Sequence, residues 1–155
     1  MFTGIYEHSI DRKGRTSMPA RFRSELGGEA YISVGIDKNL VIYSTEHFNA
    51  MAAEIGKLSL ADPTARIYRR RMFNKAEFIE IDANGRFVIP PFLRDELSNG
   101  LSAEGLDKVV FAGSNDYIEI WTCEGWEAAE NEAFHDEAMT ANFAKLMNGQ
   151  WSGND

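Results

Sequence analysis

Short apolar stretches separated by polar turns run through most of the chain, and this pattern predicts β-strands. The stretches at 31–34 and 40–43 flank a five-residue loop, which is typical of a β-hairpin, and those at 109–112 and 117–121 are arranged alike. The full set of expected strands is 4–10, 16–18, 31–34, 40–43, 78–81, 87–89, 109–112 and 117–121. The chain is therefore expected to be mostly β.

Helical spacing of apolar residues marks several of the segments between these strands. Phe48, Met51 and Ile55 share one face of a helix that we expect Thr45 to cap, and the dipeptide Asp62-Pro63 is a typical helix start. Helices are expected at 20–26, from 46, from 63, at 90–97 and after Trp126. The fold class predicted is therefore α+β, mostly β.

The sequence also repeats itself. Residues 11–26 align with residues 82–97 at a spacing of 71 and keep Asp, Gly, Arg, Pro, Arg, Glu and Leu in register. The match resumes further on at a spacing of 78, where Phe48 answers Trp126. A unit of about fifty residues buries little of its own surface, so we expect the two copies to share one core.

The repeat defines the expected organisation. Two modules, at 5–50 and 79–126, are joined by a helical connector with a basic helix at 51–78 and followed by a C-terminal helix and acidic tail at 127–155. Short strands leave edges that must be paired. Interleaved hairpins from the two modules would pair them, which predicts a small barrel with internal pseudo-twofold symmetry and flanking helices.

Charge is distributed unevenly along the chain. The net charge of −8 argues against a nucleic-acid partner, because phosphate contacts need lysine and arginine. However, residues 1–26 carry five basic and three acidic side chains, residues 66–75 carry five basic and no acidic ones, and residues 124–155 carry seven acidic ones and one lysine. A ligand meets the local field, so the basic segments keep DNA binding open.

The Asp-x-x-x-Arg turn occurs twice, as Asp11 to Arg15 and Asp82 to Arg86, and a proline and a short helix follow each time. With the basic helix between them, these motifs resemble the MraZ family, and the modules are similar to SpoVT/AbrB-type swapped-hairpin regulators. The resemblance covers nearly the full length. It implies a bacterial transcription factor that associates with the nucleoid and assembles into rings. It also implies binding to short G-rich direct repeats upstream of the division and cell-wall gene cluster, usually with repression.

The first turn is the favoured DNA contact. Arg12, Lys13 and Arg15 project from it, and arginine can grip phosphate or read guanine in the major groove. The alternative is that Arg15 only pairs with Asp11. Arg21 and Arg23, on the helix behind, are further DNA candidates.

The second turn carries less charge. Arg86 is also a DNA candidate, but holding its turn or touching a neighbouring subunit is favoured for it and for Asp82. Structural roles are expected for Asp11, Gly14, Asp82 and Gly85. The basic cluster from Arg66 to Arg71 suits phosphate and acidic protein faces equally well.

Catalysis has little support in the sequence. The three histidines are far apart, Cys123 has no CxxC partner, and no phosphate-binding glycine loop is present, so no enzyme, metal site, cofactor or small-molecule substrate is expected. A single cysteine and the lack of a long apolar run predict a cytoplasmic protein without a membrane partner. The alternative to a DNA-binding ring is a ring-forming interaction module whose arginines serve subunit contacts.

Overall fold

A computed structural model describes residues 1–98, 105–135 and 137–151. The chain divides into two compact units, Met1–Cys123 and Glu124–Asp155. The strands are β1 Ile5–Ser9, β2 Arg15–Ser17, β3 Glu29–Val34, β4 Leu40–Tyr43, β5 Glu77–Glu80, β6 Arg86–Val88, β7 Lys108–Gly113 and β8 Ile118–Trp121. The helices are α1 Ala20–Leu26, α2 Thr45–Gly56, α3 Pro63–Phe73, α4 Pro91–Ser98, α5 Cys123–His135 and α6 Glu137–Trp151. The predicted α+β class is confirmed.

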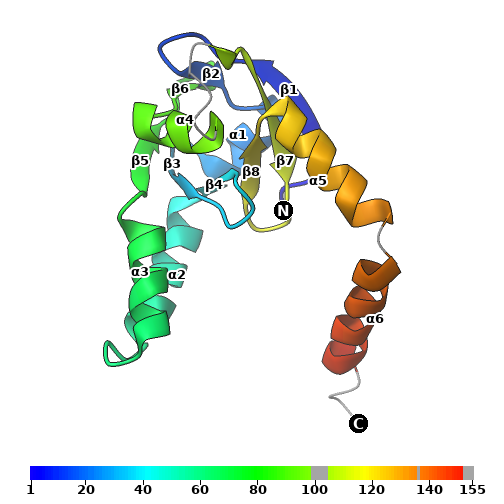
Figure 1. Cartoon of the computed structure of the whole chain (residues 1–155). Coiled ribbons are helices and arrows are strands. Elements are labelled where there is room, and N and C mark those ends of the chain that lie inside the picture. Colours follow the sequence, from blue (N-terminus) through cyan, green and yellow to red (C-terminus); the bar gives the residue numbers. More distant parts are fainter. Residues whose placement is uncertain (99–104, 136, 152–155) are drawn as a thin grey trace. The chain divides into compact units, whose positions relative to one another are not determined.

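The strands of the two modules interleave, as the repeat predicts. One sheet has the order β1-β7-β8-β4-β3-β5 and the other pairs β2 with β6, with every pairing antiparallel. Exchanging each strand for its repeat partner turns the six-stranded order into its own reverse, which is internal pseudo-twofold symmetry. Figure 1 labels these strands in the cartoon of the chain. The strands form two separate sheets, and closure of these sheets into one barrel stays a prediction.

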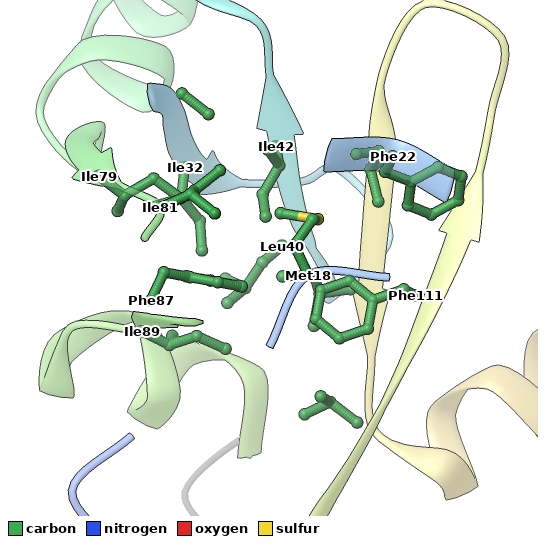
Figure 2. Packing of buried hydrophobic residues seen from close by; sticks show 14 of the residues in the cluster. Met18, Phe22, Ile32, Leu40, Ile42, Ile79, Ile81, Phe87, Ile89 and Phe111 are labelled. Atoms are coloured by element: carbon green, nitrogen blue, oxygen red, sulfur yellow. The ribbon is translucent and has the colours of Figure 1, made fainter. Parts of the chain in front are cut away.

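The core of the first unit is built from both modules. Met18, Phe22 and Ile32 from the first module pack with Phe87 and Ile89 from the second, and all are at most 3% exposed (Figure 2). Burying one large apolar side chain stabilises a fold by roughly 1.5–3 kcal/mol, so a module that lost its partner would lose much of its stability. The shared core is what fixes the two repeats against each other.

Helix starts follow capping chemistry. The side chain of Asp62 accepts a hydrogen bond of 2.9 Å from the Thr64 amide, which confirms the expected start of α3. The expectation that Thr45 caps α2 is wrong, because the Ser44 hydroxyl accepts the His47 amide at 3.1 Å and Thr45 is already helical. Both residue types cap well, so their order alone did not distinguish them.

The second unit contains α5 and α6. One helix was expected in this part of the chain, and its described residues form two, with α6 running to Trp151. Its described apolar side chains Met139, Phe143 and Leu146 are spaced for one helix face and are 55–68% exposed. Residues 99–104, 136 and 152–155 lie outside the described residues.

Candidate nucleic-acid interface

The first turn is built around the carboxylate of Asp11. Its Oδ1 accepts the backbone N–H groups of Lys13 and Arg15, each at 2.9 Å, and its Oδ2 accepts Arg15 Nε at 2.6 Å. Gly14 has φ 82°, in the left-handed region that favours glycine, and donates its N–H to the Asp11 carbonyl at 3.0 Å. In this geometry Asp11 and Gly14 both shape the backbone of the turn.

The second turn repeats this backbone. Asp82 Oδ1 accepts the N–H groups of Asn84 at 2.9 Å and Arg86 at 2.8 Å, and Gly85 has φ 81°. The difference lies in the side chains, because no ion pair between Asp82 and Arg86 is present although both residues are described. The Arg86 guanidinium is therefore less restrained than that of Arg15.

The carboxyl group of Asp11 is electrostatically distinct. The backbone N–H of Arg15, followed by its guanidinium, lowers the pKa of Asp11 below its ordinary value of 3.8. The lowered pKa extends the pH range over which the carboxylate stays ionised further into acid. The carboxylate compensates one of the three positive charges in the turn and leaves those of Arg12 and Lys13 uncompensated.

The turns flank a two-stranded ribbon. Arg15 pairs with Val88 and Ser17 pairs with Arg86 across β2 and β6, while Thr16 and Phe87 between them are buried. Because side chains alternate along a strand, Arg15 and Arg86 point to the solvent on the same face. The ribbon therefore presents two exposed arginines, each next to its own turn.

Two grooves run along this face, and the repeat relates them. The first, of 510 Å³, is lined by Ser9, Asp11, Ser17 and both arginines, Arg15 and Arg86. The second, of 710 Å³, is formed by the equivalent residues of the other module and is more acidic and apolar. It is lined by Arg15, Phe78, Ile79, Glu80, Asp82, Arg86, Phe87, Val88 and Pro90. The two arginines are common to both grooves, so they lie at the centre of the surface.

Arg12, Lys13 and Arg21 are exposed. In the described part of the chain, neither Arg12 nor Lys13 takes part in an ion pair, and their charges are free for an anionic ligand. Hydrogen bonding to Tyr6 raises the pKa of Arg21, whose guanidinium is in any case charged at physiological pH. Arg21 lies on α1, outside the ribbon.

Arg23 has a different place from the one expected. Its Nε donates to the Met18 carbonyl at 2.9 Å, and its guanidinium lies against Gly85 of the second turn. The side chain is half-buried and packs against protein, so the predicted DNA contact of Arg23 stays a prediction, which this packing disfavours. Its repeat partner Arg94 was not singled out from the sequence, although the alignment of residues 23 and 94 contained the signal.

The basic cluster on α3 bonds mainly to backbone carbonyls. Arg66 donates to Leu60 O, Arg69 to Ile55 O and Gly56 O, and Arg71 to Gly35 O, at 2.6–3.3 Å. Within the described ranges, no carboxylate forms an ion pair with these arginines. The cluster thus ties α3 to α2 and to the β3–β4 hairpin.

Among the described residues, no three histidine, cysteine or acidic side chains are grouped as metal ligands would be. The helices that the structure describes include none with the length and apolarity needed to cross a bilayer.

Comparison with known proteins follows the same division into repeats. Residues 1–71 and 72–148 each match the family described as "MraZ protein, putative antitoxin-like". A protein of Thermomicrobium roseum named "Transcriptional regulator MraZ" is 38% identical over 149 residues, which is 95% of this chain and all of the relative. Proteins of the same name from Herpetosiphon aurantiacus and Finegoldia magna are 38% and 41% identical, over 89% and 86% of this chain and 92% and 89% of theirs.

Proposed function

This chain belongs to the MraZ family of transcriptional regulators, and we propose that it is a sequence-specific DNA-binding repressor that contacts double-stranded promoter DNA through the β2–β6 ribbon and the turn at 11–15. The residues proposed to touch DNA are Arg12, Lys13 and Arg15, with Arg86 at the edge of the contact. Arg21 supplies positive charge from α1. Arg23 is left out because its guanidinium is engaged by protein.

One observation carries this proposal above the others. The first turn presents three basic side chains on a backbone that Asp11 holds in shape through two hydrogen bonds from backbone N–H groups, and a third hydrogen bond from Asp11 holds the Arg15 side chain. A two-stranded ribbon fits the major groove, and arginine there can bond guanine O6 and N7. Arg15 is held by Asp11, so its guanidinium is oriented before DNA arrives, and less ordering is needed on binding.

A single turn of this size would bind DNA weakly, at a Kd of about 10⁻⁴ to 10⁻⁶ M. We propose that several copies assemble into a ring and that this raises the effective concentration of each further contact. Subunits related by rotation present the same face in the same sense, so such a ring would read direct repeats. The resemblance to the family supports short G-rich direct repeats as the target.

The proposed target is the division and cell-wall gene cluster, in a nucleoid-associated cytoplasmic protein. The family resemblance supports this placement. A repressor bound at repeats upstream of a gene cluster would lower transcription of the cluster, so deletion of the gene is expected to raise that transcript.

The test is a fluorescence-anisotropy titration of the full-length protein against a duplex with G-rich direct repeats and against a scrambled duplex, over a series of salt concentrations. Arg15→Ala is titrated in parallel, and light scattering reports the oligomer size of both proteins. Tight, sequence-dependent and salt-sensitive binding that Arg15→Ala abolishes in an intact oligomer supports the proposal. Dissociation of the Arg15→Ala oligomer would instead assign the arginine to subunit contacts. A wild-type ring that binds neither duplex would contradict DNA binding.

A further inference from the structure

The two repeat-related arginines of α1 and α4 each lie beneath the turn of the opposite module. Arg23 donates Nε to the Met18 carbonyl and lies against Gly85, whereas Arg94 donates Nε to the Ile89 carbonyl at 3.1 Å and lies against Gly14. A Cβ atom added at Gly14 would stand 2.7 Å from Arg94 Nε. Each turn therefore packs against an arginine of the other repeat.

The two arginines differ in the number of hydrogen bonds that they make. Arg94 makes a further hydrogen bond, from Nη1 to the carbonyl of Arg12 at 2.9 Å, and the residue is only 8% exposed. Arg23 contacts Gly85 of the second turn, but it makes no hydrogen bond to Ala83, which is the counterpart of Arg12. Arg94, which makes more hydrogen bonds than Arg23, thus supports the more highly charged first turn.

The Arg94 guanidinium is fixed by backbone oxygens. Among the described residues, no carboxylate pairs with it, and its bonds to Ile89 O and Arg12 O bridge β6's end and the first turn. Ile89 is joined to the same turn again through its N–H, which donates to Gly14 O at 2.8 Å. A buried guanidinium needs hydrogen-bond acceptors for its N–H groups. The carbonyl of Arg12 is one of the acceptors of Arg94, so the Arg94 side chain fixes its position.

From this geometry we propose that Arg94 is a positioning residue for DNA binding. It touches no DNA itself, and it fixes the peptide between Arg12 and Lys13 so that both side chains leave the turn in a set direction. This inference rests on the proposed function, because it needs the first turn to contact DNA. It also means that the second module contributes to recognition through the first module's turn.

The experiment compares three full-length variants, Arg94→Met, Arg94→Lys and the matched control Arg23→Met, in the anisotropy titration, with thermal unfolding to confirm that each is folded at the assay temperature. We expect Arg94→Met to weaken DNA binding about tenfold and Arg23→Met to change it by less than about threefold. Arg94→Lys keeps the charge but lacks the fork that reaches two carbonyls, so its affinity should fall with that of Arg94→Met. Equal DNA affinities of Arg94→Met and Arg23→Met would overturn the proposal.

A double-mutant cycle distinguishes positioning from a general loss of stability. In protein that already carries Arg12→Ala and Lys13→Ala, Arg94→Met is expected to cause little further loss of affinity, because the side chains it positions are gone. Full additivity of the losses would overturn the proposal. If Arg94→Met does not fold, Arg94→Lys and Arg23→Lys are compared instead, and equal affinities again overturn it. Failure of the wild-type protein to bind DNA would contradict the proposed function before any variant is considered.

Discussion

The turn at 11–15 and the turn at 82–86 have the same backbone and different chemistry. In both, an aspartate accepts two backbone N–H groups and a glycine with φ near 80° reverses the chain. Arg12 and Lys13 of the first turn correspond to Ala83 and Asn84 of the second. The comparison separates what the fold requires, which is present twice, from the charge that we assign to DNA binding, which is concentrated in one copy.

The largest expected effect comes from removing that charge. The triple substitution Arg12→Ala, Lys13→Ala and Arg15→Ala should lower the affinity for direct-repeat DNA about 10²-fold or more, because each lost contact with DNA costs roughly 1–3 kcal/mol. Arg86→Ala is the matched change in the second turn, and it should cost about tenfold or less. Anisotropy titrations at one salt concentration measure both, and equal losses would remove the asymmetry from the account.

Adding a methyl group to the two turn glycines tests the shared backbone. A positive φ costs an alanine about 1–2 kcal/mol, and Gly85→Ala should destabilise the protein by at least this much, because the three atoms nearest to its new Cβ all belong to the flexible side chain of Arg23, which would have to shift. The Cβ of Gly14→Ala would also stand 2.5 Å from the carbonyl oxygen of Ile89, so its loss should reach ~3 kcal/mol. Urea unfolding measures both; a smaller loss for Gly14→Ala would contradict the packing described.

Charge can also be moved to the second turn. Ala83→Arg with Asn84→Lys gives that turn the basic residues of the first, and we expect the affinity for non-specific DNA to rise about three- to tenfold. The control is Ala83→Gln with Asn84→Gln, which adds bulk without charge. An unchanged affinity for the charged variant would mean that local charge is not what distinguishes the two turns.

The smallest effect concerns pH. The folded-state pKa of Asp11 is depressed, so its contribution to stability is present above its unfolded pKa of about 3.9 and is lost as the pH falls through the folded value. Asp11→Asn should therefore destabilise the protein at pH 7 more than Asp82→Asn, which loses no bond to a guanidinium. Urea unfolding should show the gap shrinking as the pH falls below the unfolded pKa of Asp11 and through its lowered folded pKa. A gap that persists unchanged in acid would contradict this assignment.

Local chemistry made much of the fold predictable from the sequence. The bounds of α1 are those expected, because Pro19 and Gly27 delimit it, and the strand positions agree within a few residues. The internal repeat predicted that the modules interleave. The register of β2 against β6 could not be predicted, because it depends on contacts between residues about 70 positions apart.

The candidate site was predictable in part. Aspartate and glycine at fixed offsets predicted the shape of both turns. Arg23 was assigned to DNA because it lies in a basic segment, yet its counterpart Arg94 lies near Asp95 and Glu96, where local charge gives no reason for an arginine. A charge that recurs in both repeats regardless of its neighbours indicated a role in the fold, and that role depends on a tertiary contact with the opposite turn.

The most direct test of the account is the salt dependence of DNA binding for the wild type, the first-turn triple variant and Arg86→Ala. Each phosphate contact contributes about 0.9 to the slope of log affinity against log salt concentration. We expect the triple variant to lose about 2 to 3 units of slope and Arg86→Ala to lose at most about 1. Equal slopes for the wild type and the triple variant would contradict the claim that the first turn is the DNA-contacting surface.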